Sequence, residues 1–184
     1  MLITDGNDTS SLKRLDWQFD FGNLADQPLF MRDLVGPYEA EIRALAMRQR
    51  TGQRVPDVVD QSILLWNVLH HVIAGYRAEH PDWTFLRNED LSEAPVEHFR
   101  RLYAQLGLRW TSRIEGQVEA GSGEGAPTEV DPADRNVTVR NSRAARWTWL
   151  QRLTPEEQDR VREGTREVAA QFYSESDWTA PGDA

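Results

Sequence analysis

Hydrophobic residues recur every three or four positions over much of this chain, which is the spacing of one face of a helix. The strongest pattern covers residues 57–77, where two adjoining apolar rows run from Val59 to Tyr76. A stripe that broad predicts a helix that packs on more than one neighbour. His80-Pro81 then predict its end, because proline lacks the backbone N–H that a continuing helix needs.

Weaker helical patterns flank this segment on both sides. The longest of them, from Pro28 to about Arg50, is expected to bend near Gly36-Pro37. A final helix starting at Pro155 is expected to bury Val161, Val168 and Phe172, and residues 19–28 are predicted to form a loop. Shorter helices are predicted over residues 11–17, 96–106 and 111–119.

Helix-end signals support several of these boundaries. Pro95 is tolerated in a first helical turn, and Gly107 suits the position just after a last turn. Thr154-Pro155-Glu156-Glu157 places a cap, a proline and a glutamate at the spacing of a capping box. The final helix is therefore expected to start at this motif.

One segment breaks the helical pattern. Residues 83–87, WTFLR, are apolar on both faces, which is typical of a buried strand in a parallel sheet. A single buried strand needs neighbours for its backbone hydrogen bonds. We therefore expect a helix-rich α/β fold with few strands, as one domain over residues 1–184, with residues 120–134 as a flexible, Gly/Pro-rich loop.

Composition narrows the classes of function. The net charge of −9 argues against binding to nucleic acid or to an anionic membrane, both of which need a basic surface. No signal peptide and no apolar run near the ~20 residues of a membrane helix is visible, so a cytoplasmic protein is expected. The chain has no cysteine and a single lysine, Lys13.

Metal and nucleotide motifs are not evident. His70 and His71 are adjacent in a predicted helix, so their side chains point about 100° apart and cannot share a metal. Neither an HExxH spacing nor a GxxxxGK[ST] loop occurs, and the glycines at 121–125 do not link a strand to a helix. No metal site is predicted.

Two polar clusters remain as candidates. Glu89 and Asp90 follow the strand candidate, and they are either general acid–base groups or charges that orient the next helix. A second cluster combines arginine forks, which match phosphate oxygens, with neutral hydrogen-bonding groups. This anion-site candidate, with an ion-paired turn as its alternative, contains Arg140, Asn141, Ser142, Arg143 and Arg146.

Taken together, these motifs resemble the sulfotransferase family. The strand candidate ends in RNEDL, and a proline and a helix ending in LGL and Trp110 follow. A variable loop, an RNSR turn, a tryptophan and LTPEE continue the family's order. The resemblance covers nearly the whole chain but only the later part of the family's domain. It implies a P-loop-like fold and sulfuryl transfer from 3′-phosphoadenosine 5′-phosphosulfate to a hydroxyl or amine of a small molecule or glycan.

The resemblance also assigns roles to individual residues. Ser11 matches a serine that binds the cofactor's 3′-phosphate, and Asn88 lies where the family approaches the adenine. Arg140, Asn141 and Ser142 match the loop that closes over the 3′-phosphate. The family's arginine and proline ahead of the serine are replaced here by Ile3 and Asp5.

The phosphosulfate loop and the usual base are expected upstream of this segment of the family's domain. No catalytic residue is therefore assigned, and the chain alone is expected to have little or no transferase activity. The alternative is a non-catalytic helical binding domain that self-associates through exposed apolar surface. A third hypothesis is a small hydrolase that uses Glu89 and Asp90.

Overall fold

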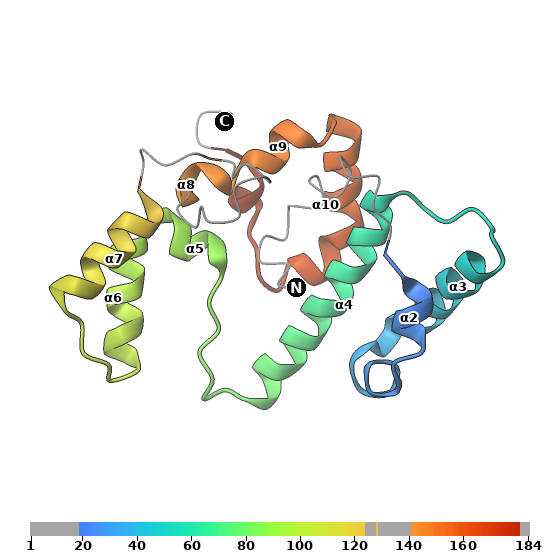
Figure 1. Cartoon of the computed structure of the whole chain (residues 1–184), viewed down its shortest axis with the longest axis horizontal. Coiled ribbons are helices and arrows are strands. Elements are labelled where there is room, and N and C mark those ends of the chain that lie inside the picture. Colours follow the sequence, from blue (N-terminus) through green and yellow to red (C-terminus); the bar gives the residue numbers. More distant parts are fainter. Residues whose placement is uncertain (1–18, 124–127, 129–140, 181–184) are drawn as a thin grey trace. The chain divides into compact units, whose positions relative to one another are not determined.

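The structure is a computed structural model that describes residues 19–123, 128 and 141–180 (Figure 1). These residues are rich in helix, and none of them lies in a strand. They belong to two compact units. The larger unit contains the described residues of 8–84 and 152–184, and the smaller unit contains those of 1–7 and 85–151.

Helix α4, Val58–Glu79, is the longest element of the larger unit. Its first turn is capped by Asp57, whose Oδ1 accepts from the N–H groups of Val59 and Asp60 at 3.0 and 3.1 Å. The helix ends at His80, so the predicted helix over residues 57–77 is confirmed. Seven of its residues between Val58 and Val68 are buried, whereas Leu69 and Tyr76 of the second apolar row are exposed.

Helix α10, Pro155–Ala169, lies beside α4 (Figure 1). The predicted capping box is confirmed: Thr154 Oγ1 accepts from the N–H of Glu157, and the Glu157 carboxylate accepts from the N–H of Thr154. The face of α10 that is fully buried carries Val161, Thr165 and Ala169. Val168 and Phe172, which were also predicted to be buried, are only partly buried.

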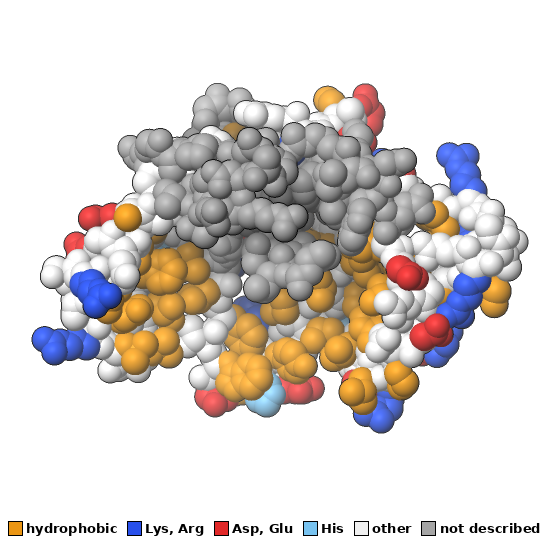
Figure 2. Space-filling view, in the orientation of Figure 1, with side chains coloured by type: hydrophobic (Ala, Val, Ile, Leu, Met, Phe, Trp, Pro, Cys, Tyr) orange, Lys and Arg blue, Asp and Glu red, His pale blue; other side chains and the backbone are white. Residues whose placement is uncertain are grey.

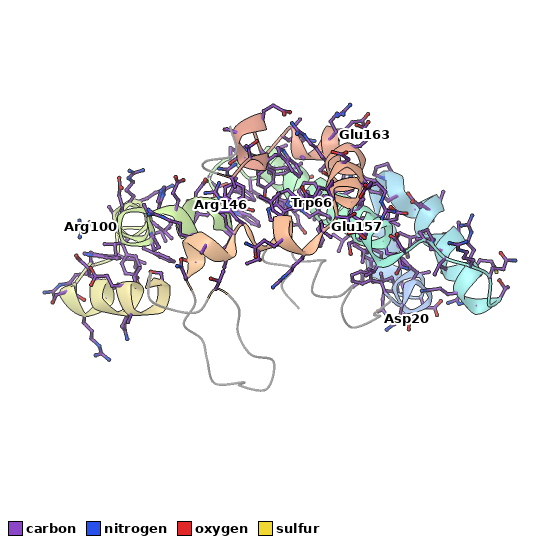
Figure 3. The ribbon with its side chains drawn as sticks, turned by 90° about the horizontal axis from the view of Figure 1, so that it is seen from above. Asp20, Trp66, Arg100, Arg146, Glu157 and Glu163 are labelled. Atoms are coloured by element: carbon purple, nitrogen blue, oxygen red, sulfur yellow. The ribbon has the colours of Figure 1, made fainter. Side chains whose placement is uncertain are left out.

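The segment predicted as a loop over residues 19–28 contains helix α2, Phe21–Ala25, so that prediction is wrong. Asp20 caps α2 by accepting from the N–H of Asn23 at 2.8 Å (Figure 3). Two glutamine side chains fix the chain just before it. Gln61, which is 1% exposed, accepts from the N–H of Phe19, and Gln49 accepts from the N–H of Phe21. Such long-range contacts have no local sequence signal.

The predicted bend near Gly36-Pro37 is confirmed. Two short helical turns, η1 Phe30–Leu34 and η2 Gly36–Tyr38, precede helix α3, Glu39–Arg50. Gly36 has a φ of +51°, which no residue inside a right-handed helix adopts. The main hydrophobic core of the larger unit joins these elements to α4; it contains Phe19, Phe21, Met31, Val35, Ile42, Leu45, Ala46, Leu64, Leu65 and Val68.

The C-terminal part of the larger unit packs on α4 through aromatic rings. The His70 ring stacks on Trp66 with centroids 3.6 Å apart and meets the edge of Phe172 at 5.2 Å. Tyr173 contacts both Trp66 and Trp178, the last residue of the short helix η3, Glu175–Trp178. These contacts bring the end of the described chain back to the middle of α4.

The buried strand predicted for residues 83–87 is not found among the described residues. Trp83, Phe85 and Leu86 are 52%, 37% and 51% exposed, so the segment is not buried on both faces. The ring of Trp83 instead stacks on His80 at 4.1 Å and lies 5.9 Å from Tyr76, at the end of α4. Apolar composition alone did not distinguish a sheet strand from an extended segment that packs its ring on a helix end.

Five helices lie in the smaller unit or end at its border. Helix α6, Pro95–Gln105, ends in a Schellman motif, because Gly107 has a φ of +66° and the N–H of Leu108 donates to the carbonyl of Tyr103. The predicted roles of Pro95 and Gly107 are thus confirmed. The helices are α5 Asn88–Glu93, α6 Pro95–Gln105, α7 Ser112–Ser122, α8 Ser142–Ala145 and α9 Thr148–Arg152.

Helices α6 and α7 form a hairpin. The Glu115 carboxylate on α7 accepts from Trp110 Nε1 and Arg100 Nη2, both at 2.8 Å. Because α7 continues to Ser122, residues 120–122 are helical and the predicted flexible loop over 120–134 begins too early. Its remaining residues, apart from 123 and 128, lie outside the described residues. None of the described helices is long and apolar enough to cross a membrane.

Candidate functional site

A polar junction of the smaller unit lies between α5 and α8. Arg143 on α8 donates from Nε and Nη2 to the backbone carbonyl of Glu93, at 3.1 and 2.6 Å. Glu93 is the last residue of α5, so its carbonyl is one of the helix-end acceptors that lack an intrahelical partner. The arginine supplies that partner, and it joins two segments separated by 50 residues in the sequence.

A second arginine engages the same residue. Arg146 Nη1 lies 3.6 Å from Glu93 Oε2, and its guanidinium carbon lies 4.6 Å from the centroid of the Trp147 ring. The Arg146 side chain is only 14% exposed, whereas that of Glu93 is 65% exposed. The junction therefore holds one largely buried cation against a carboxylate that faces solvent.

Neutral groups from α8 complete the junction. Asn141 Oδ1 accepts from the N–H of Ala144 at 3.0 Å and so caps α8. The Ser142 Oγ atom is buried and has no hydrogen-bond partner among the described residues. A buried hydroxyl without a partner is unfavourable, so Ser142 Oγ is a donor at the junction that no described residue uses.

The acidic pair after the strand candidate lies in the first turn of α5. Asp90 forms a two-pronged ion pair with Arg87, the residue before the helix, with one contact from Nε at 2.9 Å. Glu89 lies beside it in the same turn. This placement favours the helix-orienting alternative over acid–base chemistry, because the Asp90 carboxylate is committed to a guanidinium.

Of the predicted cofactor-binding residues, three lie on the two helices of this junction. Asn88 is the first residue of α5, about 8 Å along the helix axis from Glu93. Asn141 and Ser142 start α8, which contacts α5. Ser11 and Arg140 lie outside the described residues, as does Lys13.

Glu93 and Trp147 are the residues that sequence reasoning missed. A signal for Glu93 was present: it precedes Ala94-Pro95, and a helix usually ends before a proline. The carbonyl at such an end needs a donor, and the arginine-rich RNSR turn is a natural source. Nothing in the sequence indicated that this turn would meet this helix.

None of the contacts described at this junction involves a histidine. No group of residues suited to holding a metal occurs within the described ranges. His70 lies in the larger unit, where burial lowers the pKa of its ring, partly offset by a hydrogen bond of Nδ1 to the Trp66 carbonyl at 3.0 Å. The junction of α5 and α8 thus offers arginine and neutral polar groups, and both of its described arginines contact Glu93, as in the ion-paired alternative for this turn.

Comparisons with models of protein families, with curated proteins and with solved structures find no match for this chain.

Proposed function

We propose that this chain is a sulfotransferase-like protein that binds 3′-phosphoadenosine 5′-phosphosulfate, or its desulfated product, at the junction of α5 and α8. The observation that carries the proposal is the pairing of Arg143 and Arg146 with Glu93. Glu93 lies two residues after RNEDL and Arg143 ends RNSR, so residues at or near the two motifs behind the family resemblance contact each other here. Under this proposal the described helices belong to the later part of a P-loop-like α/β domain in the cytoplasm.

The chemistry of the junction supports binding of a phosphate. Arg146 is largely buried, so its attraction for an anion is screened less by solvent than that of a surface arginine. The buried Ser142 hydroxyl offers a donor for a phosphate oxygen, and Asn88 belongs to the neighbouring helix. Together these groups provide charge and directional hydrogen bonds, which specific phosphate recognition requires.

Catalysis is a separate part of the proposal. In-line sulfuryl transfer needs positive groups on the moving sulfonate and a base on the acceptor, by the logic of phosphoryl transfer. The residues around α5 and α8 supply guanidinium groups, but their carboxylates Asp90 and Glu93 are ion-paired. We therefore propose nucleotide binding with little or no sulfuryl transfer by this chain alone; the acceptor class would be a hydroxyl or amine.

Calorimetry with 3′-phosphoadenosine 5′-phosphate tests the binding proposal. The wild-type chain is expected to bind, adenosine 5′-phosphate is expected to bind more weakly, and Arg146→Gln is expected to lose about tenfold or more in affinity. Arg101→Gln is the matched control, because Arg101 is an exposed arginine of α6 that pairs with Glu97. No binding at millimolar nucleotide, or equal binding by the two variants with native circular dichroism, contradicts the proposal.

A second candidate function is a non-catalytic helical domain that self-associates. It is favoured by the exposed apolar side chains of Leu69, Tyr76 and Trp83 in the larger unit. Figure 2 shows hydrophobic side chains gathered over the C-terminal half of α4. Sedimentation velocity over a hundredfold concentration range tests this candidate; a monomer throughout, or a dimer unaffected by Leu69→Gln with Trp83→Ser, contradicts it.

A further inference from the structure

We propose that Glu93 is a built-in competitor for the anion site, so that an incoming phosphate must displace its carboxylate from Arg146. This inference rests on the proposed function, because it concerns regulation of the same site. Glu93 makes two different contacts at the junction. Its backbone carbonyl accepts from Arg143, and its side-chain Oε2 faces Arg146 at 3.6 Å.

The two contacts differ in how easily they break: the backbone carbonyl of Glu93 is fixed by the helix, whereas its side-chain carboxylate can rotate. Arg143 donates to a backbone atom at the end of α5, so rotation of the Glu93 side chain does not release it. The Glu93 carboxylate is held at a longer distance on a side chain that is 65% exposed. Although Arg146 is largely buried, the Glu93 carboxylate is already mostly in water, so rotating it away gives up only one long, partly solvated contact. The carboxylate thus leaves Arg146 while the hydrogen bonds from Arg143 to the Glu93 carbonyl still link α5 to α8.

In the proposed exchange, one anionic acceptor replaces another at Arg146. A carboxylate and a phosphate oxygen both accept charge-assisted hydrogen bonds from a guanidinium, so a phosphate oxygen takes the place of Oε2. A ligand that binds without displacing Glu93 would leave two anions at one cation, and their repulsion opposes binding. Glu93 therefore weakens the binding of any anion and makes the site discriminate against weakly charged ligands.

The test compares Glu93→Gln and Glu93→Ala with wild type, using 3′-phosphoadenosine 5′-phosphate as the probe. Both variants keep the backbone carbonyl that holds Arg143, and both lose the competing charge. Each is expected to bind the nucleotide about two- to fivefold more tightly than wild type. The gain should shrink between about 0.05 and 0.5 M salt, because screening weakens the interaction that was removed.

Glu97→Gln provides the matched control. Glu97 is an exposed glutamate of α6 that pairs with Arg101, and its replacement changes the net charge by the same amount. Equal affinities of wild type, Glu97→Gln and both Glu93 variants would overturn the competitor inference and leave the proposed function standing. The same gain in Glu97→Gln as in the Glu93 variants would assign the effect to net charge and would also overturn it. If no protein binds the nucleotide, the proposed function itself is wrong.

Discussion

Asn67 on α4 donates from Nδ2 to the backbone carbonyl of Gly164 on α10 at 2.8 Å. One turn earlier on α4, Ile63 occupies the space above the same glycine. A Cβ added to Gly164 would lie 2.8 Å from Ile63 Cγ2, which is closer than two carbon atoms can approach. The absence of a side chain at 164 is therefore what allows α10 to lie so close to α4.

This geometry predicts a background-dependent effect of Gly164→Ala. In the wild-type chain the substitution is expected to lower the free energy of unfolding by about 1–2 kcal/mol, because overpacking outweighs the helix propensity of alanine. In an Ile63→Ala background it is expected to raise stability by up to about 1 kcal/mol. Gly75→Ala on α4 is the control, since its new Cβ meets nothing within 4 Å. Urea unfolding measures all variants; the same sign in both backgrounds would contradict the assigned clash.

A second prediction separates backbone strain from crowding at Gly36. Gly36 and Gly52 both have positive φ, +51° and +67°, but only Gly36 has a close neighbour: its added Cβ would lie 2.5 Å from His71 Nε2. Gly52→Ala is expected to cost about 1 kcal/mol from backbone strain alone. Gly36→Ala is expected to cost about 2–3 kcal/mol, and His71→Ala should remove the excess. Thermal unfolding tests this; equal costs at the two glycines would show that His71 moves away freely.

The buried ring of His70 predicts how stability depends on pH. Burial lowers the pKa of His70 in the folded chain, so the unfolded chain takes up a proton first as the pH falls. Stability is therefore fully present above about pH 6.5, the unfolded value, and decreases as the pH falls toward the folded pKa. His70→Phe keeps a ring on Trp66 and is expected to flatten this part of the profile. His98→Gln on α6 serves as the control; an unchanged profile in His70→Phe would contradict the assignment.

The cap of α4 gives a fourth prediction. Burial raises the pKa of Asp57. Hydrogen bonds from the Asp60 N–H, Arg160 and the Val59 N–H lower it by more, so the pKa lies below its usual value. The charged form therefore stabilises the fold above about pH 3.9, and this contribution is lost as the pH falls through the folded pKa. Asp57→Asn keeps the cap and should lose only the acid-range slope, whereas Asp57→Ala should also cost about 1–2 kcal/mol at neutral pH. Acid titration of unfolding in the two variants distinguishes the charge from the cap.

Local signals in the sequence determined where the helices end and which of their faces are apolar. The Thr154 capping box, Pro95 at the start of α6, Gly107 after it and the stop at His80 all lie where short-range chemistry predicted them. These features succeed because the atoms involved are within a few residues of one another. The same local reasoning missed α2: its Asp20 cap is local, but Phe19 and Phe21 are held by Gln61 and Gln49, which lie 42 and 28 residues away.

Only the tertiary structure decided which polar residues meet. In the sequence, RNEDL and RNSR are two separate motifs. The contact of Glu93 with Arg143 and Arg146 depends on how α5 packs against α8. Tertiary packing likewise decided that Trp83 stacks on His80 rather than lying in a buried strand. The physical reason is the same in both cases: periodicity and caps are properties of neighbouring residues, whereas a site is made by side chains brought together across the fold.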